Sequence, residues 1–196
     1  PNQREQFLDI LDQSLRILNT NTKRAASLVR SFKQVAVDQT SNDRRKFQLL
    51  PYLNEILVSL QPKLKGRQID IKITCPEGLL IDNYPGAISQ ILTNFVMNSL
   101  HHGFENLNQG EIQITVAIDG DFLKFDYSDN GNGMDAEALG KLFDPFYTTK
   151  RGQGGSGLGT HIVYNLVTGL LGGTIKAHSS LGLGLRYHLR FPMHVR

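Results

Sequence analysis

Apolar residues recur every three or four positions along the first part of the chain. The repeat runs from Leu8 to Ala36, and the span 5–40 contains neither glycine nor proline. This spacing is typical of the narrow apolar seam of a coiled coil or a helical bundle. Because a lone helix is only marginally stable in water, we expect the seam to meet a partner. The polar run 38–43 then predicts a linker.

Beyond the linker, helix-like and strand-like patterns follow one another. Strands are expected at 46–50, 68–74, 112–118, 123–127, 174–178 and 185–191. Helices are expected at 51–64, from 83 or 84 to about 101, at 135–142 and at 158–171. Asp119-Gly120 predicts a hairpin between the third and fourth strands. Paired antiparallel strands with several helices favour a two-layer α/β sandwich, in which one mixed sheet carries helices on one face.

Composition narrows the classes of protein that fit. The 196 residues are 40% hydrophobic and 20% charged, which is a globular composition with enough length to bury a core. The single cysteine, Cys75, excludes a disulfide framework and a cysteine-rich zinc site, and favours a reducing, cytoplasmic compartment. No apolar run reaches the roughly 18 residues of a membrane span. The net charge of +3 is weak and unevenly distributed, with its basic excess on the N-terminal segment. Because that excess is spread along the segment, a solvated helix face explains it better than nucleic-acid binding does.

A polar stripe borders the apolar face of the helix expected at 84–101. Its members follow the spacing i, i+4, i+7 and i+8, and they are Asn94, Asn98, His101 and His102. Asparagine is a poor helix former, so two asparagines one turn apart favour a functional role over a purely structural one. An amide oxygen is a hard ligand that suits Mg²⁺. A solvated helix face remains an equal alternative for this segment.

Two glycine-containing segments could approach a ligand with their backbones. Asp129-Asn-Gly-Asn-Gly133 follows a strand, and its carboxylate could accept a hydrogen bond from an exocyclic amine, although a plain turn would look the same. The run 151–159 leads into a helix, whose N-terminus favours phosphate. It is neither a P-loop, since the Gly-Lys-Ser/Thr ending is missing, nor a Rossmann turn, since no strand precedes it.

Taken together, these segments closely resemble the N, G1, F and G2 boxes of the ATP-binding domain of sensor histidine kinases. The matching positions, in order, are Asn94 and Asn98, Asp129-x-Gly131-x-Gly133, Phe143-x-Pro-Phe146, and Gly155-x-Gly157-x-Gly159. The resemblance covers about 46–192, and extends more broadly to DNA gyrase, the mismatch-repair ATPases and the large heat-shock chaperone. It implies a Bergerat-type α/β sandwich over 46–196, with 1–42 as the second helix of a dimerisation and histidine-phosphotransfer bundle. It also implies ATP and Mg²⁺ as cofactors, homodimerisation through the N-terminal helix, and a response-regulator receiver domain as partner.

The resemblance further implies roles for single residues. Asp129 would accept the adenine amino group, Asn98 would ligate Mg²⁺, and Asn94 and Lys150 would be catalytic. The nucleotide-binding set it implies is Asn98, His101, His102, Asp129, Gly131, Gly133, Lys150, Arg151, Gly155, Gly157, Leu158 and Gly159. Phe143 and Phe146 would anchor the lid that carries Lys150 and Arg151.

The chain departs from the family pattern in three places. Ser99 stands where alanine is usual, which we expect to be harmless, and Leu185 stands where the family usually ends a glycine motif with threonine. No histidine precedes His101, so the implied phosphoacceptor histidine would lie upstream of Pro1. Two other functions remain as hypotheses: a hydrolytic ATPase of the same fold, and a nucleotide-sensing or dimerising module. The first is disfavoured because its members place glutamate at Asn94, and an amide cannot act as a general base.

Overall fold

The computed structural model describes residues 6–19, 21–22, 43–149 and 157–195. Residues 6–19 and 21–22 are helical, as the apolar repeat predicts, and their side chains are exposed. The exposed positions include the first seam leucines, from Leu8 to Leu18. The predicted seam beyond Thr22 and most of the predicted linker lie outside the described residues. No helix in the described ranges is both long enough and apolar enough to cross a bilayer.

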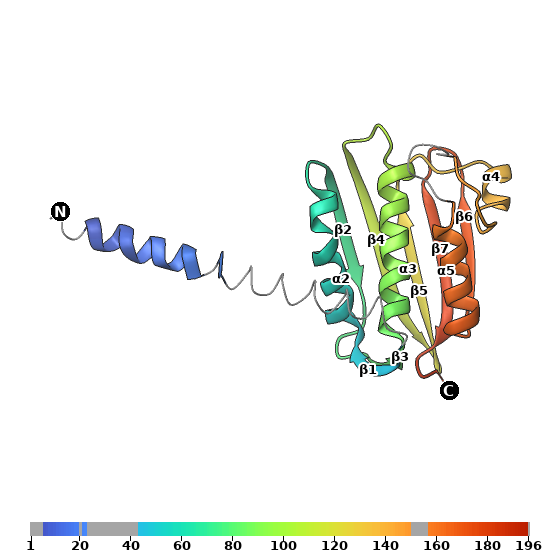
Figure 1. The fold of residues 1–196 in the computed structure, drawn as a ribbon, viewed down its shortest axis with the longest axis horizontal. Helices are drawn as coiled ribbons and strands as arrows, with labels where there is room; N and C mark the ends of the chain where they lie inside the picture. The colour runs from blue at the N-terminus through green and yellow to red at the C-terminus, as the bar shows by residue number, and fades with distance from the viewer. Residues whose placement is uncertain (1–5, 20, 23–42, 150–156, 196) are drawn as a thin grey trace.

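The remaining chain forms helices and strands in the order that the sequence predicts, with one addition (Figure 1). The strands are β1 (Arg45–Gln48), β2 (Gln68–Thr74), β3 (Leu80–Asn83), β4 (Gln109–Asp119), β5 (Phe122–Asp129), β6 (Thr174–Ser179) and β7 (Leu185–Pro192). The helices are α2 (Leu49–Leu64), α3 (Pro85–Asn98), α4 (Ala136–Gly140) and α5 (Gly159–Asn165). Wider π turns continue α3 over Ser99–Gly103 and α5 over Leu166–Leu170.

Five strands form one mixed sheet in the order β2-β4-β5-β7-β6. The β2–β4 pair is parallel, and the other three pairs are antiparallel. The predicted hairpin joins β4 to β5, where Gly120 adopts the positive φ of +62° that its turn requires. The predicted mixed-sheet α/β sandwich is therefore confirmed, and β1 and β3 form a separate two-stranded sheet beside it.

One face of the five-stranded sheet is covered by helices, and no described helix covers the other face, which we call the bare face. Helices α2, α3 and α5 pack side by side on the covered face (Figure 1). Alternate residues of each strand point under these helices, such as Ile112, Ile114 and Val116 of β4, and all three are buried. The alternate residues on the opposite face remain largely exposed, so the sheet has an apolar inner side and a polar outer side.

The structure differs from the sequence prediction at the start of this domain. Leu49 and Leu50, expected in a strand, begin α2, which therefore starts two residues before Pro51. Proline fits there because a backbone N–H in the first turn needs no intrahelical acceptor. Strand β3 was not predicted, because Leu80-Ile-Asp-Asn83 does not alternate apolar and polar residues. It forms by pairing with β1, with Phe47 opposite Ile81.

Candidate nucleotide-binding site

A cavity of about 440 Å³ opens between α3, the end of β5 and the start of α5. It collects most of the residues that the sequence singled out, although they are far apart along the chain. The predicted site residues that line it are Asn94, Asn98, His101, His102, Asp129, Gly133, Gly157 and Gly159. Gly131 and Leu158 are not among the residues that line it. Lys150, Arg151 and Gly155 lie outside the described residues, so their predicted roles stay predictions.

Asp129 is the buried acid of this cavity. It is the last residue of β5, and only 7% of its surface is exposed. Its Oδ1 accepts hydrogen bonds from the backbone N–H groups of Gly131 at 3.0 Å and Leu185 at 3.3 Å. Its Oδ2 accepts one from the Ser99 hydroxyl at 2.5 Å. A carboxylate offers about four acceptor positions, so one remains for a ligand amine.

Glycines let the backbones around Asp129 approach each other. A Cβ on Gly131 would lie 2.4 Å from the Gly103 carbonyl oxygen, and one on Gly133, which has a φ of +65°, would lie 2.0 Å from the Ser180 carbonyl oxygen. Both distances are far inside van der Waals contact. From the sequence, we interpreted these glycines as positions where the backbone comes close to a ligand. In the structure they are already required by contacts within the protein, and only Gly133 also lines the cavity.

The two asparagines of α3 face the start of α5. Asn94 donates its Nδ2 to the Gln90 carbonyl at 2.9 Å, which turns its Oδ1 toward Gly159. A Cβ on Gly159 would lie 2.8 Å from that oxygen and 3.9 Å from the Asn98 Oδ1. The side-chain oxygens of Asn94 and Asn98 therefore both lie near Gly159, and a larger residue at position 159 would crowd the Asn94 oxygen. Hard oxygen donors in this number suit Mg²⁺, which usually takes few protein ligands and completes its shell with phosphates and water.

Tyr187 adds a polar group that the sequence did not reveal. Its ring stacks on Phe95 with centroids 4.0 Å apart, and its hydroxyl is buried beside Asn98. Burial raises the pKa of this phenol, and the Asn98 amide partly offsets that effect. Among the described residues, none completes a well-aligned hydrogen bond to the hydroxyl. A buried polar atom left in this state on a cavity wall can serve a bound ligand or water.

The histidines and the segment after α4 form the outer part of the cavity. His102 makes a 3.1 Å hydrogen bond between its Nδ1 and the Thr149 hydroxyl, and so ties the end of α3 to this segment. Phe143 packs between Tyr164 and Tyr187, while the lid that it is predicted to anchor lies outside the described residues, so that role stays a prediction. Phe146 differs: its side chain is 63% exposed, and its backbone, with a φ of +64°, packs against Gly157 instead.

Ser99 is the most informative residue that the sequence analysis undervalued. We expected its hydroxyl to be a harmless addition, but it lies at the centre of a buried chain of hydrogen bonds. Because its single hydrogen goes to Asp129, the Tyr127 hydroxyl must donate to Ser99 across their 2.8 Å contact. Burial raises the pKa of Tyr127, the nearby Asp129 carboxylate adds to that effect, and the Ser99 contact opposes it. No sequence pattern predicts such a contact, because Ser99 and Asp129 are 30 residues apart in the sequence and meet only in the folded chain.

Comparison with known proteins agrees with this geometry. The model of the family described as histidine kinase-, DNA gyrase B- and HSP90-like ATPase matches residues 83–195. The sensor histidine kinase ZraS of Escherichia coli O157:H7 is 31% identical over 144 residues, which are 73% of this chain and 30% of ZraS. The sensor kinase CckA of Brucella abortus is 29% identical over 202 residues, 95% of this chain and 20% of CckA. The chain thus spans less than a third of the length of these relatives.

Solved structures show the same fold. The catalytic domain of the histidine kinase ThkA superposes with a TM-score of 0.67 at 26% identity, covering 78% of this chain and 97% of that domain. The region matched by the family model includes α3, the Asp129 loop and α5, which are the elements that build the cavity. The chain therefore belongs to the histidine kinase-, DNA gyrase B- and HSP90-like ATPase family, and it carries the ATP-binding catalytic domain of a sensor histidine kinase.

Proposed function

We propose that this chain binds ATP with Mg²⁺ in the cavity described above and positions the γ-phosphoryl group for transfer to a histidine of a helical bundle. The observation that carries the proposal is the arrangement around Asp129. A buried acceptor with a spare lone pair and two converging amide oxygens line the same cavity. An adenine bonded to Asp129 would leave the amide oxygens of Asn94 and Asn98 to the Mg²⁺ and the phosphates.

The protein groups have distinct tasks in this proposal. Asp129 accepts the adenine amino group, and its three hydrogen bonds hold the carboxylate in place before the nucleotide arrives. Asn98, with Asn94 in support, would hold Mg²⁺, which would neutralise charge on the phosphates. Lys150 and Arg151 would contact the β- or γ-phosphate. Phosphoryl transfer depends mainly on such positioning and charge stabilisation.

Hydrolysis by this site is the weaker alternative. Water attack needs a positioned base, and the α3 position that would supply one holds Asn94. Its amide NH₂ is committed to the Gln90 carbonyl, and its oxygen is not basic enough to remove a proton from water. These contacts favour transfer to an external acceptor.

Calorimetry with ADP tests the adenine assignment. We expect Asp129→Asn to weaken ADP binding by roughly ten- to a hundredfold, since a charge-assisted hydrogen bond contributes about 1.5–3 kcal/mol. Asp126→Asn is the matched control, because Asp126 lies on the same strand but points to the opposite face, where it contacts His188. Equal loss of affinity in both variants, or none in Asp129→Asn, would remove Asp129 from the adenine site.

We also propose that the chain pairs with a second copy through its N-terminal helix and that its phosphoryl acceptor relays to a response regulator. The helix exposes apolar side chains that need a partner, among them Leu11 and Leu15. A ThkA structure solved in complex with a response regulator supports the second part by analogy. Sedimentation should show self-association that Leu15→Asn reduces and Gln13→Asn, on the same exposed helix, leaves unchanged. A parent chain that stays monomeric at high concentration would contradict the dimer.

A further inference from the structure

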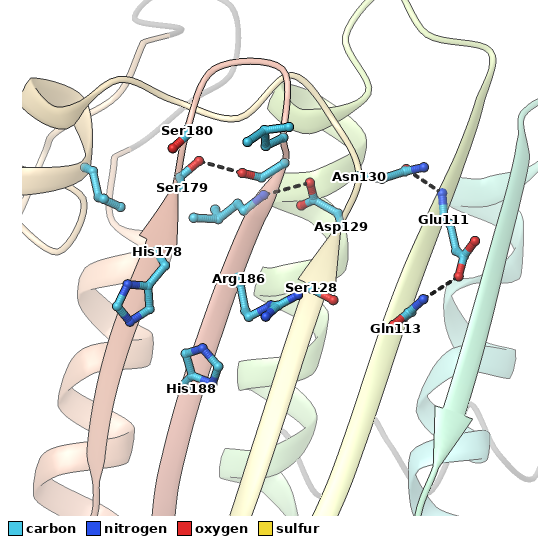
Figure 2. Close-up of a pocket in the computed structure, with 14 residues that line it drawn as sticks. Glu111, Gln113, Ser128, Asp129, Asn130, His178, Ser179, Ser180, Arg186 and His188 are labelled. Carbon is cyan, nitrogen blue, oxygen red and sulfur yellow. Dashed lines mark hydrogen bonds between the residues drawn. The ribbon is translucent and has the colours of Figure 1, made fainter.

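The face of the sheet opposite the helices holds a second cavity, of about 770 Å³, distinct from the one proposed to bind the nucleotide. Figure 2 shows it in front of the strands, with the helices behind the sheet. Its floor is made by outward side chains of β4, β5, β6 and β7, and its upper wall by the loop between β6 and β7. Asp129 and Leu185 line both cavities, and the Asp129 carboxylate already accepts hydrogen bonds from Ser99, Gly131 and Leu185.

Basic side chains gather on the β6–β7 half of this face. Strand register places His178 directly opposite Arg186, and Lys176 directly opposite His188. Cations that lie directly opposite each other across a sheet repel. Whenever the histidines are protonated, both rows therefore carry like charges, and His178 and His188 already touch, with ring centroids 5.3 Å apart.

The carboxylates of this face are already committed elsewhere. Asp126 contacts His188 at 2.6 Å, and Asp119 is shared by Arg190 at 3.0 Å and Lys124 at 3.5 Å. On the far side, Glu111 is held by Lys72 at 3.3 Å. Within the described part of the chain, none of these acids reaches Arg186 or Lys176. Arg186, Lys176 and His178 are thus exposed with no counter-charge among the residues that the structure describes.

The rim of the cavity is apolar beside these cations. Leu183 in the β6–β7 loop lines the cavity and is 79% exposed, and Leu181 in the same loop is 70% exposed. The loop itself is braced, because the Ser179 hydroxyl donates to the Gly184 carbonyl at 2.6 Å and accepts from the Met134 N–H at 2.9 Å. The leucines are therefore presented by a fixed turn. A small inorganic anion would satisfy the cations and leave the leucines in water.

We propose that this cavity, with Arg186 at its centre, docks an acidic segment of a partner protein, with Asp or Glu carboxylates at Arg186 and His178 and an apolar side chain on Leu183. A planar guanidinium beside an imidazole suits a carboxylate, which Arg can hold through two parallel hydrogen bonds. The space of about 770 Å³ takes several residues of an extended peptide rather than one ion. Charge complementarity and the exposed leucines point to the same occupant.

Fluorescence anisotropy on the full chain tests the proposal. The probe is a short fluorescein-labelled peptide of alternating acidic residues and leucines, compared with a copy that carries Asn and Gln in place of Asp and Glu. We expect the acidic probe to bind and the neutral copy not to, and Arg186→Gln to weaken binding about tenfold or more, as for loss of a charge-assisted hydrogen bond. Lys63→Gln is the control, since it removes the same charge from an exposed position of α2, on the other side of the sheet. Leu183→Ser should also weaken binding of the acidic probe, because it removes the proposed apolar contact.

Two additional readouts make the outcome decisive. Amide chemical shifts should move in β6, β7 and their loop when the probe is added, and ADP affinity should be the same in Arg186→Gln as in the parent, which shows that the variant is folded. Equal probe binding by Arg186→Gln and the parent would overturn the proposal, as would the absence of any binding. Displacement of the probe by equimolar inorganic phosphate would also overturn it, because the site would then recognise a simple anion.

Discussion

Ser99 donates a hydrogen bond to the Asp129 carboxylate across 2.5 Å and joins α3 to β5 inside the core. The bond sets the direction of the acid that faces the nucleotide cavity. It also connects that acid to Tyr127, whose hydroxyl lies 2.8 Å from Ser99. Ser99, which stands where the family pattern usually has alanine, is therefore hydrogen-bonded to Asp129, the residue that we propose binds adenine.

Ser99→Ala should weaken both folding and nucleotide binding. It leaves the Tyr127 hydroxyl without its partner and removes a donor from the buried Asp129 carboxylate. Leaving buried polar groups unpaired costs about 1–3 kcal/mol, so we expect a loss of that size in the free energy of unfolding. ADP affinity should fall several-fold, because the carboxylate is less firmly held.

The matched control is Ser59→Ala in α2, which removes a hydroxyl that bonds only to the Ile56 carbonyl three residues earlier. Chemical denaturation and calorimetry on both variants separate the two effects. A Ser99→Ala protein as stable as the parent, with unchanged ADP affinity, would show that the hydrogen bond has no energetic consequence.

Gly131→Ala should destabilise the fold although it adds a single methyl group. The new Cβ would lie 2.4 Å from the Gly103 carbonyl oxygen, which is backbone and cannot rotate away. Overpacking of this kind costs about 1–3 kcal/mol. Gly140→Ala is the control, since nothing lies within 4 Å of its Cβ position, and there the change should be neutral or slightly stabilising. Equal melting temperatures for the two variants would contradict the packing argument.

The sequence predicted the elements more completely than it predicted their contacts. Alternation identified β2 and β5 because one face of each strand packs against the core and the other is more exposed: the inner residues of β5 are buried, and those of β2 are partly buried. It could not identify β3, whose four residues form a strand only because β1 pairs with them. Short-range pattern carries the first kind of information and not the second.

The same limit applies to the site. Asn94, Asn98 and Asp129 stood out by residue type and spacing, and the structure brings them to one cavity. Tyr187 and Ser99 were not identified as site residues, because each is defined by a partner on another element. Gly131 was noticed for closeness to a ligand, whereas its close neighbour in the structure is the Gly103 backbone.

Asn98→Ala should reduce the contribution of Mg²⁺ to ADP binding more than it reduces binding itself. Measuring ADP affinity with Mg²⁺ and with EDTA, in parent and variant, gives a cycle whose coupling energy isolates the metal. If Asn98 is a ligand, we expect a coupling of about 1 kcal/mol or more, within the range for groups in direct contact. Asn54→Ala is the control, because it makes the same substitution at an exposed position of α2, where the Asn54 side chain bonds the Leu50 carbonyl one turn earlier. Parallel losses with and without Mg²⁺ would mean that Asn98 acts on the nucleotide or on Tyr187.

The last prediction concerns chemistry that these 196 residues cannot complete by themselves. The six histidines begin at His101, and none lies on the N-terminal helix. His102 is held by Thr149 at the cavity rim, and His161 is bonded to the Phe143 carbonyl at 3.0 Å, so neither imidazole is placed to attack a γ-phosphate in line. The chain should therefore bind ATP without gaining an acid-labile phosphate.

The check is incubation with γ-labelled ATP, followed by acid and base treatment of the protein, with phosphate release measured in parallel. A fusion that adds a histidine-bearing helix before residue 1 should acquire the label, and Asp129→Asn should abolish it. Stable histidine labelling of the unfused chain, or steady phosphate release at an ATPase rate, would show that Asn94 does not prevent attack by water or that one of these histidines is an acceptor.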